Sequence, residues 1–206
     1  MFITFEGGEG TGKSTQVKVL AERLRAEGKD VVTTREPGGT PDAEALRGLL
    51  VSGEPGRWTA NEELLLNFAA RSSHLRHEIK PALAAGKVVI CDRFVDSSFV
   101  YQVAAGGADK MLFSQLVQTI AKGSVPNFTF ILDIDPTLGA ARAATRTATT
   151  AGAAENRFER KGEAFHKAVR SAFAEVANQH SQRCHLIDAN GSVDEVANRI
   201  WAKLHG

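Results

Sequence analysis

A glycine-rich segment near the start of the chain constrains the fold more than any other feature. It reads Gly7-Gly8-Glu9-Gly10-Thr11-Gly12-Lys13-Ser14 and lies between the apolar run from Phe2 to Phe5 and a helical pattern. In such a loop the glycines let successive backbone N–H groups converge on phosphates, while Lys13 supplies a positive charge and Ser14 a hydroxyl for Mg²⁺. The segment predicts a nucleoside triphosphate bound at the N-terminus of a helix; a glycine-rich turn without a ligand is the alternative.

Length and composition limit the class of protein. The chain has 206 residues, enough for one substantial core and too few for two ordinary domains, so we expect a single domain over 1–206. Hydrophobic residues at 43%, charged residues at 24% and a formal net charge of +1 favour a soluble protein that binds neither nucleic acid nor membrane. Because the chain opens with a strand and phosphate loop, and no apolar run reaches the length of a membrane span, we expect a cytoplasmic protein.

Strand-like and helix-like segments alternate along the chain, which is typical of a parallel sheet covered by helices. A helical spacing of apolar residues from Lys13 to Glu27 ends at Gly28, a residue that favours helix termination. Cys91 and Cys184 lie in or beside apolar runs, so we expect both to be buried hydrophobic residues without a disulfide or metal. The five expected strands are Phe2 to Phe5, Val31 to Thr34, Val88 to Cys91, Phe128 to Leu132 and Cys184 to Ile187.

Two pairs of polar residues predict where further helices begin. Thr59 with Glu62, and Ser192 with Glu195, have the spacing of capping boxes, in which each side chain bonds to the other residue's backbone N–H. Pro81 lies inside the first of these helices, where a missing N–H predicts a local disturbance.

One stretch of biased composition lies late in the chain. Ala143 to Ala154 is almost entirely Ala and Thr, and the charged segment Glu155 to Glu163 follows it. A helix-like segment from Leu138 to Arg146 leads into this stretch. We expect a flexible surface flap, a mobile lid inserted at about 143–161.

A second chemical site is expected where the third strand ends. Val88 to Cys91 is followed by Asp92-Arg93-Phe94. Ligands of parallel sheets lie beyond the carboxyl ends of the strands, where the phosphate loop also lies. Asp92 is thus placed to hold Mg²⁺ or its water shell and Arg93 to bind a second phosphate; an exposed salt bridge at a strand end is the alternative.

The set of segments along the chain resembles the thymidylate kinase family. The resemblance is carried by motifs in family order over nearly the whole length, although none after the phosphate loop is specific alone. They are Phe5-Glu6-Gly7 to Thr15, Thr34-Arg35-Glu36-Pro37-Gly38-Gly39-Thr40, Phe68-Ala69-Ala70-Arg71 with His74, Asp92-Arg93-Phe94 through Ser97, Ser98 and Tyr101-Gln102, and Arg157-Phe158-Glu159.

The resemblance implies a fold and a reaction. The fold is the α/β P-loop nucleoside monophosphate kinase fold, with a five-stranded parallel sheet flanked by helices and a mobile lid. The reaction is Mg²⁺-dependent transfer of the ATP γ-phosphoryl group to dTMP, giving dTDP and ADP. The family also forms homodimers, and a surplus of apolar positions over 62–84 and 111–120 favours these helices as the interface.

The same resemblance implies which residues bind each ligand. Phe68 and Arg71 share a helix face and are suited to stacking on a base and donating to its carbonyl, although a core Phe beside a surface Arg is the commoner arrangement. The ATP-binding set is Gly7, Gly8, Glu9, Gly10, Thr11, Gly12, Lys13, Ser14, Thr15 and Arg142. The dTMP-binding set is Arg35, Phe68, Arg71, Arg93, Ser98, Tyr101 and Gln102, and the expected Mg²⁺ contacts are Ser14 and Asp92.

Catalysis requires a cation against the transferred group. The family takes this cation from the phosphate loop or from a lid arginine, and the loop here contains no arginine. Arg146 is therefore the first candidate, with Arg157 as the alternative, and either residue could instead be a solvated surface arginine. The implied catalytic residues are Lys13, Arg93, Arg146 and Glu9, the last as the acidic group that meets the acceptor's 3′-hydroxyl.

Three other functions compete with this interpretation. A kinase for another pyrimidine monophosphate would differ mainly around the base-binding residues. A GTPase-type switch would need an Asn-Lys-x-Asp segment, which the sequence lacks. A nucleic-acid-stimulated ATPase is disfavoured by the balanced charge and the absence of a basic stripe.

Overall fold

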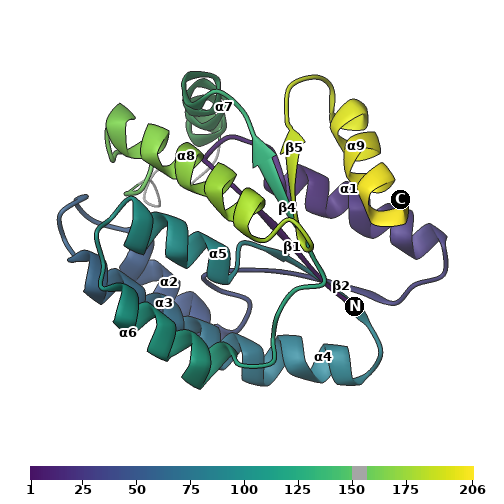
Figure 1. The fold of residues 1–206 in the computed structure, drawn as a ribbon, viewed down its shortest axis with the longest axis horizontal. Helices are drawn as coiled ribbons and strands as arrows, with labels where there is room; N and C mark the ends of the chain where they lie inside the picture. Colours follow the sequence, from purple (N-terminus) through teal and green to yellow (C-terminus); the bar gives the residue numbers. More distant parts are fainter. Residues whose placement is uncertain (150–156) are drawn as a thin grey trace.

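A five-stranded, wholly parallel sheet with helices on both faces forms the centre of the computed structural model, which describes residues 1–149 and 157–206, and the side chains of all of these except 143–149 (Figure 1). The strand order is β2-β3-β1-β4-β5, so β1, which leads into the phosphate loop, is central. The expected fold class is confirmed, and each strand extends one or two residues beyond its predicted end. The strands are β1 (Phe2–Gly7), β2 (Val31–Arg35), β3 (Val88–Asp92), β4 (Phe128–Asp133) and β5 (Cys184–Asp188).

The helices occupy the connections between these strands. Three of the described α-helices continue directly into a π-helical segment, which is labelled η. The helical elements are α1 (Lys13–Ala26), α2 (Pro41–Val51), α3 (Ala60–His74), η1 (Leu75–Ile79), α4 (Lys80–Ala84), α5 (Val95–Ser98), η2 (Phe99–Ala104), α6 (Lys110–Leu116), η3 (Val117–Ala121), α7 (Pro136–Thr149), α8 (Glu163–Gln179) and α9 (Val193–His205).

One face of the sheet is covered by α1 and α9, which lie side by side (Figure 1). Residues of β1 such as Ile3 and Phe5 pack there against Leu20 of α1 and Ile200 of α9. These side chains are almost fully buried, and burial of a large apolar side chain contributes about 1.5–3 kcal/mol. This layer holds the helix that follows the phosphate loop firmly against the sheet.

The opposite face is covered by α8, η1 and η2. Ile131 packs against Phe173 of α8 and Val100 of η2, and Val89 packs against Ile79 of η1. Helix α3, which continues into η1, packs against α2 and η2, and its Phe68 contacts α6. The elements that carry Arg71, Ser98 and Tyr101 are thus packed around one edge of the sheet.

The local signals for helix ends behave as expected. Both capping boxes are present: Thr59 and Glu62 exchange side-chain to backbone hydrogen bonds at the start of α3, and Ser192 and Glu195 do so at the start of α9. Gly28 follows α1 with a positive φ of 79°. Cys91 and Cys184 are both buried and free, as predicted.

The disturbance expected at Pro81 lies before the proline. In the π turn Leu75–Ile79, the N–H of Lys80 donates to the carbonyl of Leu75, five residues earlier. Pro81 itself lies in the first turn of α4, where its missing N–H is tolerated. The preceding turn widens because a proline ring cannot be accommodated against a regular turn.

The described end of the expected flap is not a free surface segment. Arg157 is fully buried and its N–H donates to the carbonyl of Val51 at the end of α2, at 3.3 Å. A surface flap was the wrong expectation for this residue, because the charge of Glu155 to Glu163 suggested solvation and buried ion pairs leave no local sequence signal. Residues 150–156 lie outside the described part of the chain.

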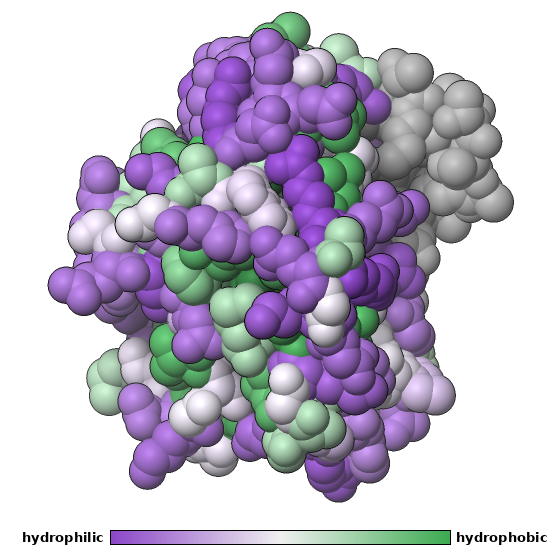
Figure 2. Space-filling view, turned by 90° about the vertical axis from the view of Figure 1, so that its right-hand side faces the viewer, coloured by the Kyte–Doolittle hydropathy of each residue, from purple (hydrophilic) through white to green (hydrophobic). Residues whose placement is uncertain are grey.

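Polar and apolar side chains are interspersed over the side of the molecule where α9 lies in Figure 1, as Figure 2 shows. More strongly exposed apolar side chains lie on other helices, including Met111 of α6 at 72% and Leu65 of α3 at 48%. Among the described helices, none combines the length and the apolar character needed to cross a membrane.

Candidate active site

A cavity of about 430 Å³ opens at the carboxyl edge of the sheet. The phosphate loop forms one end, and the ends of β2 and β3, parts of α2, α3, α5 and η2, and residues 158–159 form the rest. The parallel register places these parts together, because Phe5 of β1 lies opposite Asp92 of β3. Residues that are more than 80 positions apart, such as Glu9 and Arg93, therefore line one space.

The phosphate-loop end is built from backbone. Gly12 caps α1 in a left-handed conformation, with φ 90°, which an L side chain rarely adopts. A Cβ at Gly10 would overlap the carbonyl oxygen of Gly139 in α7, so the loop and the start of α7 are in direct backbone contact. The loop is thus held in a conformation that only glycine allows.

Lys13 lies across this loop with its ammonium against backbone carbonyls. Its Nζ donates to the carbonyl oxygens of Gly8, at 2.7 Å, and Gly7, at 3.2 Å. Burial, followed by the positive charge of Arg93, lowers the pKa of Lys13 from 10.5 to about 8. A bound anion would favour the charged form of this ammonium and so offset both effects.

Ser14 and Asp92 meet at the same end of the cavity. The Ser14 hydroxyl donates to Asp92 Oδ2 at 2.7 Å, and both residues line the cavity. Both residues were predicted from the sequence to contact Mg²⁺, and the structure brings them together from α1 and β3. A hydroxyl and a carboxylate are hard oxygen ligands of the kind Mg²⁺ takes alongside water and phosphate oxygens.

Arg93 is the centre of a charged cluster in the middle of the cavity. It has a left-handed backbone, φ 70°, which turns its side chain back toward the phosphate loop. Its Nη2 donates to Glu9 Oε1 at 2.6 Å and to the Tyr101 hydroxyl at 3.3 Å. Its Nη1 donates to the carbonyl of Gly7 at 3.0 Å. The sequence-predicted residues Glu9, Arg93 and Tyr101 are thus in contact between the two ends of the cavity.

Glu6, near the end of β1, is buried beside this cluster, and no role was predicted for it from the sequence. It is fully buried, and its Oε1 accepts from the backbone N–H of Phe94 at 2.8 Å and of Ser97 at 3.2 Å. Burial, with the nearby carboxylate of Asp96, raises the pKa of Glu6 to about 8. A charged residue at the end of a mainly apolar strand was the signal for a buried polar role.

The other end of the cavity is built from side chains around Arg71. Its Nε donates to Glu36 Oε2 at 2.7 Å and its Nη2 to the Ser98 hydroxyl at 3.0 Å. Glu36 Oε1 lies 3.1 Å from Nδ1 of His74, whose Nε2 is 2.7 Å from the Thr34 hydroxyl. Arg71 is 2% exposed and lines the cavity, yet its Nη1 has no hydrogen-bond partner. A buried guanidinium donor without a partner favours a ligand with an acceptor at this point.

Phe68 does not line the cavity with Arg71. Its ring is fully buried, and the Arg71 guanidinium lies over it at 4.5 Å from the ring centroid. The ring of Phe113 meets it edge-on from α6. The shared helix face predicted for the pair is present, but Phe68 supports Arg71 from behind instead of reaching the space beside it.

Four of the expected ligand-binding residues differ in exposure. Tyr101 and Gln102 are buried and line the cavity, whereas Arg35 lies near the surface, 53% exposed, and pairs with Glu44. Arg142 is exposed in α7, does not line the cavity, and lies 3.5 Å from the carbonyl of Ala189. Arg142 is therefore not brought to the cavity in this conformation.

The two arginines considered for catalysis have different surroundings. The backbone of Arg146 belongs to α7, and its side chain lies outside the described residues. The guanidinium of Arg157 is fully buried, donating to the carboxylate of Glu63 and to the carbonyl oxygens of Leu50, at 2.9 Å, and Glu54, at 3.1 Å.

The fold and the cavity together define the P-loop nucleoside monophosphate kinase class, with a phosphate loop at one end and a polar pocket at the other. A thymidylate kinase family profile matches residues 5–200. The chain belongs to the thymidylate kinase family, and the resemblance noted from its motifs is confirmed.

Individual relatives agree with this assignment over nearly their whole lengths. The thymidylate kinase of Caulobacter vibrioides is 49% identical, covering 97% of this chain and 93% of the relative. That of Magnetococcus marinus is 47% identical, covering 100% of this chain and 95% of the relative. The crystal structure of thymidylate kinase from Ehrlichia chaffeensis superposes with a TM-score of 0.78 at 35% identity, covering 100% of this chain and 98% of the other.

Proposed function

We propose that this protein transfers the γ-phosphoryl group of ATP to dTMP, giving dTDP and ADP. The observation that carries the proposal is a single cavity with a phosphate loop at one end and the unpaired Nη1 of buried Arg71 at the other. Family membership supports the same substrate pair. The cavity volume of about 430 Å³ falls within the range of sites for small organic ligands.

At the donor end, the phosphate loop binds the ATP phosphates through its N–H groups, with Lys13 as a point charge. The N–H groups at the start of α1 face the phosphates, where the helix dipole also favours anions. When bound, Mg²⁺ neutralises phosphate charge. Ser14 and Asp92 would hold it; the described residues contain no group of three His, Cys, Asp or Glu side chains suited to a metal, so most other ligands would be water and phosphate oxygens.

At the acceptor end, Arg71 donates to the carbonyl of the base. Arg71 can offer only donors, which favours the 4-oxo group of thymine and opposes the 4-amino group of cytosine. Ser98 and Gln102 border the same space and supply further polar contacts, and Tyr101 limits the room beside the sugar. Phe68 packs against the guanidinium of Arg71 and helps to hold it in place.

Between the two ends, Arg93 binds the acceptor's phosphate and Glu9 approaches its 3′-hydroxyl. Their side chains form an ion pair, which supports a common location. When the substrate binds, each side chain must replace part of this ion pair by a contact to the substrate. Because the acceptor is already a phosphate anion, this proposal includes no general base. Arg35, at the cavity's rim, adds positive charge.

For the cation that stabilises the transferred group, we propose Arg146, with Arg142 beside the ATP. Helix α7, which carries both, begins in contact with the phosphate loop at Gly139. Arg157 is less suited because its guanidinium is fully buried among three partners.

We also propose a cytoplasmic homodimer that uses α3 and α6 as its interface. The support is the apolar surface of these helices, where Leu65 and Met111 are exposed. Sedimentation at micromolar concentration should give twice the monomer mass of 22.1 kDa. A monomer at that concentration would contradict the interface.

The function is tested by coupled measurement of ADP release with ATP and Mg²⁺. The acceptors to compare are dTMP, dUMP, UMP, CMP, AMP and GMP. We expect dTMP to give the highest kcat/KM, with dUMP next because it shares the 4-oxo group. A preference for CMP or AMP would overturn the proposal, since Arg71 would then face an amino group.

A further inference from the structure

A buried carboxylate outside the cavity joins two parts of its acceptor wall. Glu63, in the first half of α3, is 1% exposed and does not line the cavity. Its Oε2 accepts from Gln102 Nε2 at 3.0 Å. Its Oε1 accepts from Arg157 and, at 3.0 Å, from Lys161 Nζ. We call these four residues the Glu63 cluster.

The first connection leads to Gln102, which lines the acceptor end of the cavity. A glutamine amide can present either its carbonyl or its NH₂ to a ligand. The bond from Nε2 to Glu63 fixes the NH₂ on the cluster side and leaves the carbonyl oxygen for the cavity. Since Gln102 is 3% exposed, little freedom remains for the amide to turn over.

The second connection leads through Arg157 to Phe158. The Arg157 guanidinium is held by Glu63, by two carbonyl oxygens of the α2 region and by the face of Phe158, 5.0 Å from its centroid. Phe158 lines the cavity and meets Tyr101 edge-on at 5.9 Å. The ammonium of Lys161 covers the rings of Phe158 and Phe165 at 5.0 and 4.8 Å.

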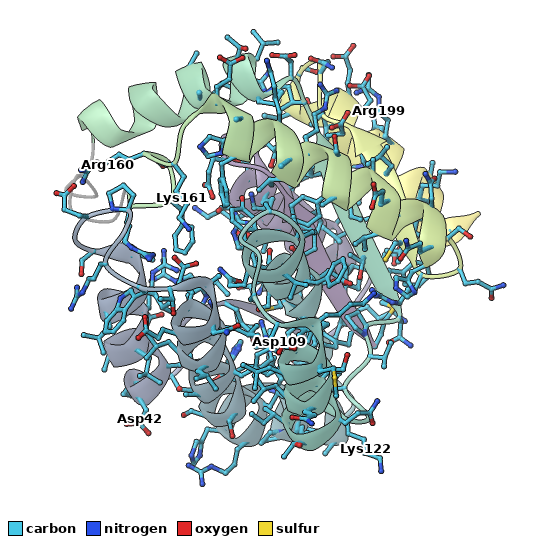
Figure 3. The ribbon with its side chains drawn as sticks, turned by 60° about the vertical axis from the view of Figure 1, so that its left-hand side comes forward. Asp42, Asp109, Lys122, Arg160, Lys161 and Arg199 are labelled. Atoms are coloured by element: carbon cyan, nitrogen blue, oxygen red, sulfur yellow. The ribbon has the colours of Figure 1, made fainter. Side chains whose placement is uncertain are left out.

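The carboxylate of Glu63 is shared by two positively charged side chains. Two cations, Arg157 and Lys161, face this one carboxylate, and Arg157 is completely buried. Removing the partner of a buried charge is far more disruptive than removing an exposed one. In Figure 3, Lys161 lies just before α8 and Arg160 further toward the outside, where it pairs with exposed Glu54.

We infer that Glu63 is a positioning residue for the acceptor, acting through Gln102 with one oxygen and through the Arg157–Phe158 turn with the other. It touches no ligand; it sets the orientation of the Gln102 amide and the place of the Phe158 ring against Tyr101. This inference rests on the proposed function, since the affected ligand is dTMP. Within the described part of the chain, the hydrogen-bond partners given above for Glu63 lie outside the phosphate loop, so ATP recognition should depend on the cluster much less than dTMP recognition does.

The first experiment compares Glu63→Gln with the wild type by steady-state kinetics, varying dTMP and ATP separately. The substitution keeps the shape and removes the charge. We expect the KM for dTMP to rise about 10-fold and the KM for ATP to change less than about 2-fold. Glu163→Gln, which removes a carboxylate from the exposed Glu163–Lys167 pair of α8, is the matched control and should change neither. Equal rises of both KM values would overturn the inference.

Another experiment needs no substrate and measures whether the Arg157–Phe158 turn stays in place. Trypsin must bind the arginine side chain, so fully buried Arg157 should resist cleavage in the folded wild type. Brief digestion followed by mass spectrometry should show cleavage after Arg157 appearing in Glu63→Gln and not in Glu163→Gln. Continued protection in folded Glu63→Gln would show that Glu63 does not hold the turn. This arm stays valid even if wild-type enzyme proves inactive on dTMP, which would instead refute the proposed function.

A double-mutant cycle gives a further test that leaves Glu63 itself unchanged. Arg157→Met and Gln102→Met each cut one connection, and their effects on kcat/KM for dTMP should deviate from multiplicativity by about 3-fold or more. Both connections pass through one carboxylate, so losing one alters the other. Multiplicative effects would mean that the two connections act independently, which contradicts the inference.

Discussion

The two ends of the cavity recognise their ligands by different means. The donor end comes mainly from one continuous segment, with glycine backbone, Lys13 and the start of α1, and β3 adds only Asp92. The acceptor end assembles side chains from separate elements: Arg71 contacts Glu36, 35 positions away, and Ser98, 27 positions away. Phosphate recognition by backbone is therefore encoded locally, whereas base recognition depends on packing of the whole fold.

The largest effect should come from a residue that belongs to neither end. Arg146→Ala should lower kcat about 10³-fold, the scale of arginine fingers, with dTMP binding nearly intact. Arg146→Lys should restore activity only in part, because an ammonium cannot bridge two phosphate oxygens as a guanidinium does. Turnover is measured by ADP release and dTMP binding by calorimetry. An active Arg146→Ala with an inactive Arg157→Ala would move the role to Arg157.

At the donor end, Lys13→Ala should reduce kcat about 10²–10³-fold, because its charge matters most in the transition state. Lys18→Ala, at an exposed position of the same helix, is the control and should retain wild-type kcat. The coupled assay at saturating ATP and dTMP measures both. Near wild-type turnover of Lys13→Ala would remove Lys13 from the site.

At the acceptor end, Arg71→Ala should raise the KM for dTMP about 10- to 100-fold, since a charged hydrogen bond contributes about 1.5–3 kcal/mol. The KM for ATP should hardly change if the two ends are as separate as their construction indicates. Arg71→Lys keeps a charge beside Glu36 and separates lost recognition from an unpaired buried carboxylate. Arg76→Ala, at an exposed position of η1, is the control. An equal rise in the KM for ATP would show that the two ends are not independent.

The smallest effect concerns Glu6, in the region between the two ends, and is measured as a change in the free energy of unfolding. The pKa of Glu6 is about 8 in the fold against an ordinary value of 4.5, so its stabilising contribution is complete below 4.5 and is lost as pH rises to 8. Wild-type unfolding free energy should therefore fall between pH 6 and 7.5 by up to about 2 kcal/mol more than that of Glu6→Gln, which has no proton to lose.

Chemical denaturation at several pH values checks this prediction. The exposed glutamate of α1 gives a matched control, Glu22→Gln, which should follow the wild-type pH dependence. If Glu6→Gln shows the same fall in stability as the wild type, Glu6 is ionised in the fold across this range.

The same division explains what the sequence could predict. The phosphate loop, the strands and the capping boxes depend on residues within a few positions of one another, and all are present as expected. Two of the helices that were overlooked have local signals: Thr40 and Pro41 cap α2, and Val169, Phe173 and Val176 give α8 its buried stripe.

What could not be predicted depends on partners that are distant in sequence. The spacing of Phe68 and Arg71 indicated a shared face, but the packing of Phe113 from α6 decides that Phe68 lies behind the guanidinium. Likewise, nothing near Arg157 indicates that Glu63, 94 positions earlier, buries it. Pairing of charges across a fold has no periodicity, so only the folded structure identifies it.

The close approach of Gly10 and Gly139 has a mechanical consequence. The two backbones meet there without side chains between them. If α7 tilts about this contact, the rest of the helix acts as a lever arm. Arg146 lies seven residues along this arm, about 10 Å at 1.5 Å per residue, so a tilt of about 10° would displace its backbone by about 2 Å. A methyl group at Gly139 would press on the carbonyl oxygen of Glu9, and would thereby shift the contact and the position of Arg146 without substituting a residue of the phosphate loop.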